Sequence, residues 1–372
     1  MYPTPRDRVL MALAFQETDI VPYHLMIDER VQRRLSEYFQ NDQFDNQIIN
    51  HLPFLNLEPK TYPISDTSFV DVFGCKWRSG NFPHLEEVPL QEPSLQHYKF
   101  PELIEEDTLK DTNLFFERYN QHFTLCGIAH GFFDRGWALR GMENFLVDCV
   151  AHPLFVEELF EILTEIYLKM IDHIAGYPFD GIRFGDDWGH QRGVLIGVSR
   201  WRKLVKPGLR KIFTRAREKG LAVMVHSDGD VTELIPDLIE IGVQILNPLQ
   251  PEAMDILEIK RLYGRDLCFN GGISTQLTLP RGTTKDVRRE VAACLELLGR
   301  GGGYVISPAK AILPDVPIEN AVALIDALTN QGMASFGGSW TLDTHTAVLK
   351  RVYAEFHPEK ETVERRTRRP VS

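Results

Sequence analysis

Hydrophobic positions in the second half of the chain form short continuous runs, each followed by polar or glycine residues. In the clearest example, the apolar residues Leu221–Val225 follow Gly220 and give way to His226–Gly229, which reads His-Ser-Asp-Gly. A strand that is buried on both faces has this pattern, as in a parallel sheet. The same pattern predicts strands around Tyr23, Leu125, Ile182, Val223, Ile245, Cys268 and Val305, and it leaves an eighth strand ambiguous.

Segments with apolar residues at helical spacing alternate with these strands. The first helix is expected to begin at Pro5 with Thr4 as its N-cap, and further helices are predicted over Glu29–Phe39 and Pro153–Ala175. Strands that alternate with helices at this interval predict parallel βα units. Nearly every predicted strand ends in polar or glycine-rich residues, whereas an open doubly wound sheet needs them only at its switch point. The pattern therefore predicts an α/β fold of the (β/α)8 TIM-barrel type.

Two segments break this alternation. Residues 41–111 are rich in proline, aspartate and aromatic residues, with a strand pair predicted around Phe69–Trp77. A long irregular segment inside a compact protein is typical of a functional cover, so we expect a loop-rich insertion or lid after the first strand. Residues 358–372 have few apolar residues and a cluster of arginines, which predicts a disordered basic tail. The predicted organisation is a single barrel domain over residues 1–357.

Composition and charge narrow the classes of function. The chain has 372 residues, 43% of them hydrophobic, and its formal net charge of −11 argues against a nucleic-acid partner, whose phosphates require a basic surface. The cysteines lie far apart without a Cys-x-x-Cys pair, so neither a disulfide framework nor a zinc ribbon is indicated. Met1–Asp19 carries charges throughout, and no apolar run has the length of a membrane span. We therefore expect no signal peptide, no membrane partner and a cytoplasmic location.

Polar side chains at the predicted strand ends are the candidates for chemistry, because barrels carry their active sites at the carboxyl ends of the strands. His226 and Asp228 are two residues apart, so in an extended segment their side chains point to the same side. Mixed carboxylates, imidazoles and a lysine suit a divalent metal site, general acid–base catalysis or an anion-binding pocket, although Asp228-Gly229 is also an ordinary turn dipeptide. The candidates are Asp186, Asp187, His226, Asp228, Asn247, Gln250, Asn270, Ser307 and Lys310, joined by His130 if the second strand is placed correctly.

Several segments together resemble the uroporphyrinogen decarboxylase-like superfamily over roughly Pro3 to Leu328. The segments that carry the resemblance are Thr4–Val9, Asp19–Pro22, Phe184–Gly189, Lys206-Pro207, His226–Gly229, Asn247-Pro248, Asn270–Ile273, Gly301–Tyr304 and Asp315–Asn320. The resemblance implies a (β/α)8 barrel with its site at the carboxyl ends of the strands, in agreement with the hydrophobic pattern.

The superfamily holds two main activities, the decarboxylase of the heme pathway and the cobalamin-linked methyltransferases. The decarboxylases share an Arg-Gln-Ala-Gly-Arg segment after the first strand, whose arginines bind substrate carboxylates. This chain has His24–Arg30, read His-Leu-Met-Ile-Asp-Glu-Arg, at the equivalent place. The departure disfavours porphyrinogen decarboxylation and favours the methyltransferase branch.

The methyltransferases of the superfamily hold zinc with a His-x-Cys pair and a later cysteine, and the zinc activates a substrate thiol. Here His226 matches, Asp228 stands in place of the first cysteine and Lys310 in place of the second. Many relatives with aspartate at the first position carry histidine at the second, so Lys310 departs from these as well. A His–Asp metal site for a hard oxygen substrate, or no metal at all, fits these residues better than a thiolate site.

The resemblance predicts a methyltransferase that moves a methyl group between a small O- or N-methyl substrate and a corrinoid protein or tetrahydrofolate. A corrinoid would be carried by a partner protein, since this chain has no Asp-x-His-x-x-Gly segment. The alternatives are a decarboxylase or lyase acting on a small carboxylate, with Lys310 as the anion-binding cation, and a non-catalytic binding barrel. A homodimer is left open.

These roles are divided among the candidate residues as follows. We expect His226, Asp228, Asp187 and Lys310 to be catalytic and His24, His130, Asp186, Asn247, Gln250, Asn270 and Ser307 to bind or position the substrate. At most one divalent ion, zinc being the candidate, is expected at His226 and Asp228 with help from Asp186 or Asp187. The alternative is that the ammonium of Lys310 takes the place of the ion and neutralises Asp228.

Overall fold

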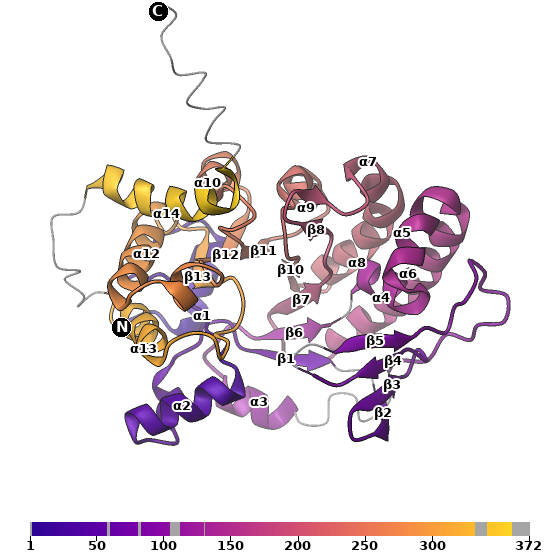
Figure 1. Cartoon of the computed structure of the whole chain (residues 1–372), viewed down its shortest axis with the longest axis horizontal. Coiled ribbons are helices and arrows are strands. Elements are labelled where there is room, and N and C mark those ends of the chain that lie inside the picture. The colour runs from indigo at the N-terminus through magenta and orange to yellow at the C-terminus, as the bar shows by residue number, and fades with distance from the viewer. Residues whose placement is uncertain are drawn as a thin grey trace, which may run out of the picture.

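The computed structural model describes residues 2–57, 60–80, 83–104, 112–129, 131–331 and 341–358 (Figure 1). Among these residues, seven parallel strands form one sheet in the order β1-β6-β7-β10-β11-β12-β13. The strands are β1 (Phe54–Leu57), β6 (Leu125–Ile128), β7 (Gly181–Gly185), β10 (Ala222–His226), β11 (Ile245–Leu249), β12 (Cys268–Ile273) and β13 (Tyr304–Pro308). Each strand of this sheet pairs with the strand of the same sheet that comes next along the chain. This is the topology of a βα barrel.

The segment around Tyr23 lies between β13 and the chain that leads into β1. Tyr23 forms a parallel bridge with Ile306 of β13, and the N–H of His51 donates a 3.0 Å hydrogen bond to the carbonyl of Tyr23. The strand predicted around Tyr23 is thus present only as isolated bridges, and β1, which lies inside the predicted insertion, was not predicted. The fold is an α/β barrel of the TIM type, which confirms the predicted fold class.

Helices surround the sheet and alternate with its strands along the chain (Figure 1). They are α1 (Pro5–Leu13), α2 (Glu29–Phe39), α3 (Thr112–Arg118), α4 (Phe132–Arg140), α5 (Met142–Ala151), α6 (Pro153–Ile174), α7 (Val198–Arg200), α8 (Lys206–Glu218), α9 (Ile235–Glu240), α10 (Ile256–Tyr263), α11 (Thr278–Arg281), α12 (Thr284–Leu297), α13 (Ile318–Thr329) and α14 (Leu342–Phe356). Thr4 caps α1 together with Asp7 in a capping box, as its residue type predicts. No helix among the described residues combines the length and apolar character needed to cross a bilayer.

Part of the predicted insertion forms a second, antiparallel sheet. In the described part of residues 60–87, its strands are β2 (Thr61–Ser65), β3 (Ser68–Asp71), β4 (Lys76–Arg78) and β5 (His84–Glu87). The pairing of β3 with β4 confirms the strand pair predicted around Phe69–Trp77. This sheet packs on α4, where the rings of Trp77 and Trp137 meet edge to face at 6.1 Å. Its role as a lid stays a prediction.

Side-chain alternation along the barrel strands separates two apolar clusters. Val223 and Val225 of β10 belong to the large cluster that also contains helix residues, whereas Ala222 and Met224 belong to a smaller cluster with Ile245 and other strand residues. Successive side chains of a strand point to opposite faces, so the smaller cluster is the inside of the barrel. All five cysteines are buried free thiols, in agreement with the absence of a predicted disulfide framework.

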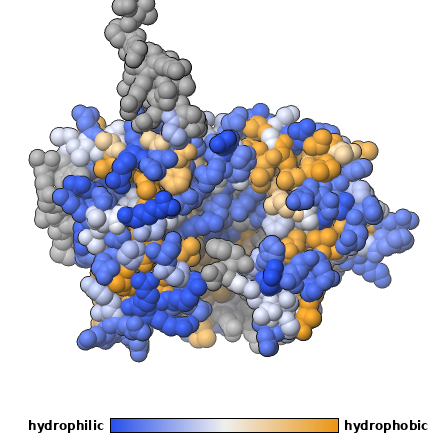
Figure 2. Space-filling model, in the orientation of Figure 1, coloured by the Kyte–Doolittle hydropathy of each residue, from blue (hydrophilic) through white to orange (hydrophobic). Residues whose placement is uncertain are grey.

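Hydrophobic residues also gather on the outer surface over α5 and the start of α6. Val147, Val150 and Leu154 are exposed there, and Figure 2 shows hydrophobic surface in this part of the molecule. Exposed apolar patches often mark protein–protein contacts. The homodimer left open by the sequence stays a prediction, and residues 359–372, the predicted tail, lie outside the described residues.

Candidate active site at the carboxyl ends of the strands

The same alternation places the candidate residues inside the barrel mouth. Met224, Ile245 and Cys268 belong to the inner apolar cluster. Two residues further along each of these strands come the polar side chains His226, Asn247 and Asn270. Because side chains repeat every second residue, this polar layer lies above the apolar one at the carboxyl ends of the strands. The sequence-based placement of these three residues is therefore correct in its geometry.

A chain of hydrogen bonds fixes the orientation of the His226 ring. The side-chain NH2 of Asn270 donates to the carbonyl of Val305 at 3.0 Å, and its Oδ1 accepts from the NH2 of Asn247 at 2.6 Å. The remaining Oδ1 of Asn247 lies 2.6 Å from Nδ1 of His226. Since a carbonyl can only accept, the order of donors along this chain gives Nδ1 of His226 the hydrogen. Its Nε2 then keeps a free lone pair.

Burial keeps this imidazole neutral. Burial, followed by the charge of Arg183, lowers the pKa of His226 to about 4, although Asp228 and Asn247 act in the opposite direction. At neutral pH the ring is therefore uncharged and can serve as an acceptor or a metal ligand through Nε2.

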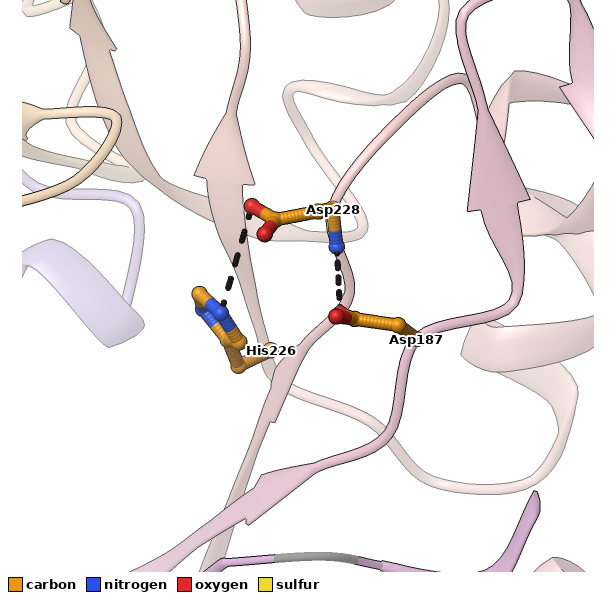
Figure 3. A group of neighbouring side chains, drawn as sticks. All are labelled: Asp187, His226 and Asp228. Atoms are coloured by element: carbon orange, nitrogen blue, oxygen red, sulfur yellow. Dashed lines mark hydrogen bonds and ion pairs between the residues drawn. The ribbon is translucent and has the colours of Figure 1, made fainter. Parts of the chain in front are cut away.

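Two carboxylates complete a triad with His226 (Figure 3). The backbone N–H of Asp228 donates a 2.8 Å hydrogen bond to Oδ1 of Asp187, and Nε2 of His226 lies 4.0 Å from Oδ1 of Asp228. Gly229 follows with a φ of +83°, a conformation that favours glycine, and its N–H donates to Oε1 of Gln250 at 2.9 Å. The turn that holds Asp228 is thus fixed from two neighbouring strand ends, and Gln250 acts on the backbone of this turn.

Lys310 lies beside the triad. Its Nζ is 2.6 Å from Oδ2 of Asp228, and its side chain is 41% exposed. The other oxygen of Asp228, Oδ1, is buried and accepts no hydrogen bond from any residue that the structure describes. Asp228 therefore has one oxygen neutralised by the ammonium and one available to a ligand.

The triad offers a donor set that suits one divalent ion. Asp187, His226 and Asp228 each provide a ligand atom, and these atoms lie within 4.8 Å of one another. One imidazole nitrogen and two carboxylate oxygens are common ligands of zinc, and the Asn247 contact is the kind of outer-shell hydrogen bond that orients a metal-binding histidine. The residues fit such an ion, with Asp187 rather than Asp186 as the third donor.

Both carboxylate oxygens of Asp186 are hydrogen-bonded within the chain. It is completely buried, with Oδ1 accepting from the N–H of Asp134 at 2.8 Å and Oδ2 from the indole N–H of Trp188 at 2.6 Å. Burial raises the pKa of Asp186 to about 7. Burial and the neighbouring carboxylates also raise the pKa of Asp134, a partly buried acid that no sequence signal singled out. The hydrogen bonds of Asp186 and Asp134 hold the backbone beside the site in place. Burial and Asp228 raise the pKa of the more accessible Asp187.

A cavity of about 560 Å³ opens beside the triad and is lined by His226, Lys310 and Arg183. A smaller inner space, lined by His24, Asn247, Asn270 and Ser307, adjoins it through the shared residues Arg183 and Lys310. His130 lies outside the described residues.

Arg183 was missed by sequence reasoning. It is a charged residue between the buried Ile182 and Phe184 in the middle of a strand, and that position was the available signal. Its side chain enters the barrel instead of leaving it.

Comparisons with known proteins identify the family of this chain. The family model described as Uroporphyrinogen decarboxylase (URO-D) matches residues 67–331. The chain belongs to the URO-D family. It is 21% identical over 344 residues to the methylcobamide:CoM methyltransferase MtaA of Methanosarcina barkeri, covering 87% of this chain and 97% of that protein. It is also 34% identical over 76 residues to a uroporphyrinogen decarboxylase of Pseudoalteromonas translucida, covering 20% of this chain and 21% of that protein.

A solved structure supports the same fold. A methyltransferase from Methanosarcina mazei superposes with a TM-score of 0.67 at 17% identity, covering 89% of this chain and all of that one. Within the URO-D family, the segment His24–Arg30 differs from the arginine-bearing segment of the decarboxylases. The arginine present in it, Arg30, is paired with Asp28 at 2.9 Å.

Proposed function

We propose that this URO-D family protein is a corrinoid-linked methyltransferase. It moves a methyl group between a small O- or N-methyl substrate and a corrinoid protein or tetrahydrofolate. The similarity to a methylcobamide:CoM methyltransferase over most of both chains supports this class of reaction. The observation that carries the proposal is the triad at the barrel mouth, in which the free Nε2 of His226 and the free oxygen of Asp228 face each other.

The donor atoms of the triad define the place of the reacting atom. A zinc ion held by Asp187, His226 and Asp228 would act as a Lewis acid that polarises the oxygen or nitrogen bearing the methyl group. The absence of cysteine from this set suits a hard oxygen or nitrogen atom better than a thiol.

The chain's own residues manage charge and protons at this place. The neutral ring of His226 presents its lone pair outward because Asn247 holds its hydrogen on the opposite side. When the methyl group leaves an oxygen or nitrogen, that atom takes up a proton; in the site without an ion, Asp187, whose pKa is raised by burial and by Asp228, is the residue that would supply it. Lys310 neutralises Asp228 and keeps its carboxylate in position.

The spectrum of the corrinoid tests this proposal. The protein is incubated with methylcob(III)alamin and a panel of acceptors bearing hydroxyl or amino groups, and the expected result is acceptor-dependent conversion to cob(I)alamin under anaerobic conditions. His226→Ala should lose this conversion. An unchanged corrinoid spectrum, together with carbon dioxide release from a small carboxylate, would instead establish the lyase alternative, which the cations Lys310 and Arg183 of the cavity favour.

A further inference from the structure

Arg183 is a cation inside the barrel that faces the same cavity as the triad. It lies in the middle of β7 and lines the cavity of about 560 Å³ together with His226 and Lys310. Its guanidinium lies 5.0 Å from the centre of the Phe54 ring. An arginine in this place can reach a molecule that occupies the cavity.

The other arginine and the lysine that line this cavity have counter-ions, whereas Arg183 has none among the described residues. Arg30 is paired with Asp28 at 2.9 Å, and Lys310 with Asp228 at 2.6 Å. Across the described residues, no carboxylate forms an ion pair or hydrogen bond with Arg183. The nearest acids, Asp187 and Asp228, act on it only at longer range. A charge taken out of water without a partner is costly, so this position favours an anion from outside the chain.

Unpaired polar atoms in the adjoining inner space extend this observation. Ser307 is 2% exposed, and its hydroxyl has no hydrogen-bond partner among the residues described. Nδ1 of His24 is likewise buried without one. Both residues line the inner space together with Arg183. Buried polar groups are nearly always hydrogen-bonded in a complete structure, so these atoms are further contacts for a polar ligand group.

The remaining wall of the cavity is largely apolar. Met26, Ile27, Ala311, Leu313 and Pro314 line it, and a volume of about 560 Å³ is in the range of small-molecule sites. An occupant therefore has a hydrocarbon body between a charged end and the triad.

We propose that Arg183 is the receptor for a carboxylate on the substrate. The substrate is a small carboxylic acid with an O- or N-methyl group. Its carboxylate contacts Arg183 and the Ser307 hydroxyl, its apolar body lies against the wall from Met26 to Pro314, and its methylated atom faces His226 and Asp228. This inference rests on the proposed methyl transfer for the role of the substrate, whereas the binding of the carboxylate can be measured without any transfer.

The binding test uses carboxylates that have no methyl group to transfer from oxygen or nitrogen. Thermal unfolding is measured with formate, acetate and benzoate, each matched to formamide, acetamide or benzamide, at constant ionic strength set with sodium chloride. The carboxylates are expected to raise the melting temperature in a concentration-dependent way, whereas the amides are not. Arg183→Met should weaken the apparent affinity by about ten- to a hundredfold, the range expected for a charged hydrogen-bonded pair.

Two further variants make the binding result decisive. Arg265→Met, an exposed arginine before β12, at the other end of the barrel strands, should leave the affinity unchanged. Arg183→Lys keeps the charge but loses the paired donors of the guanidinium, so an intermediate affinity is expected. Equal shifts with amides and carboxylates, no shift with any carboxylate, or undiminished binding in Arg183→Met or Arg183→Lys would overturn the proposal.

A transfer test then separates this inference from the proposed function. Methyl transfer to cob(I)alamin is measured from 3-methoxybenzoate and methoxyacetate, each against its uncharged amide. A preference for the acids that Arg183→Met abolishes, mainly through a higher KM, supports both proposals. Carboxylate binding without any corrinoid reaction would refute only the methyl transfer, and equally fast transfer from acids and amides would refute only the role of Arg183.

Discussion

The buried Arg135 and the partly buried Arg183 have opposite surroundings. Arg135 of α4 forms an ion pair with Asp71 of β3 at 2.7 Å, and its guanidinium lies 4.0 Å from the centre of the Phe73 ring. Arg183 also lies over a phenylalanine, but no carboxylate contacts it among the residues that the structure describes. Burial lowers the pKa of Arg183 to about 10, whereas for Arg135 the neighbouring Tyr167, Asp71 and Cys75 outweigh burial and raise the pKa.

The difference separates a structural charge from a functional one. Asp71 also accepts hydrogen bonds from the backbone of Phe73 and Cys75 and from the indole of Trp77. The pair with Arg135 thus attaches the antiparallel sheet to the barrel with all charges compensated inside the chain. Arg183, at the mouth, has no such carboxylate partner among the residues that the structure describes. The presence or absence of a counter-ion within the chain, more than burial, therefore distinguishes a structural arginine from one proposed to bind a ligand.

The largest expected effect follows from breaking the compensated pair. Asp71→Asn leaves Arg135 buried without its counter-ion, and removing one partner of a buried ion pair costs about 3–5 kcal/mol of unfolding free energy. Urea unfolding measures this loss, with the exposed Asp266→Asn as a control that should remain close to the wild-type protein. A loss below about 1 kcal/mol would show that the Asp71–Arg135 pair is not the structural anchor described here.

A buried carboxyl group that forms no ion pair among the described residues is the opposite case to Arg183. Glu290 of α12 is 1% exposed and accepts from the N–H of Ser274 at 2.6 Å. Burial raises its pKa from 4.5 to about 7, so the folded protein holds a proton that the unfolded chain releases. The stabilising contribution of this protonated carboxyl group to the free energy of unfolding is complete below pH 4.5 and is lost as the pH rises to about 7.

The glutamine variant removes this titration. In Glu290→Gln the decline of unfolding free energy between pH 4.5 and 7 should be smaller than in the wild-type protein, by on the order of 2–3 kcal/mol. Denaturant titrations at several pH values measure the difference, and Glu296→Gln, at a partly exposed position of the same helix, serves as the control. Superimposable pH profiles for wild type and Glu290→Gln would show that Glu290 is ionised in the folded state.

A smaller effect, on metal affinity, is expected from breaking the hydrogen-bond chain that orients His226. Asn247→Leu removes the contact that holds the hydrogen on Nδ1 of His226. Loss of such an orienting partner lowers metal affinity by about 10- to 100-fold. Zinc titration with a competing chelator measures this change, and His226→Ala, which removes the ligand itself, should retain no bound ion. Unchanged zinc affinity in both variants would show that the triad does not bind the metal.

Lys310 provides the mildest test, because its pair with Asp228 is partly exposed. Lys310→Met should lower methyl-transfer turnover by about tenfold while leaving the fold intact, since exposed pairs contribute little to stability. Lys310→His should also lower turnover, without changing the metal content. Near-normal turnover in Lys310→Met would exclude the lysine from the reaction.

The strand pattern of the sequence predicted most of the barrel and part of the site. Period-two alternation is a local property, so it correctly placed His226, Asn247 and Asn270 at the mouth. It also predicted the helix Glu29–Phe39 with the same bounds as α2. The strand β1 was not recognised, because it lies among prolines and aspartates and depends on its pairing with β6.

Properties that depend on contacts between distant segments could not be predicted in the same way. Asp186 and Asp187 are adjacent and identical in type, and only the indole of Trp188 and the N–H of Asp134 decide that Asp186 turns into the core. Arg183 looks like one more charged residue until the counter-ions of its neighbours are known. Charge compensation is a property of the assembled barrel, not of a sequence window.

The unfolding free energy of Arg183→Met tests the contrast between the two arginines most directly. If Arg183 is an uncompensated cation reserved for a ligand, its replacement by an apolar side chain of similar length should leave stability unchanged or raise it, because burying the charge no longer costs free energy. Transfer from a carboxylate substrate should decline in the same variant. A loss of stability comparable to that of Asp71→Asn, with carboxylate binding retained, would contradict this account.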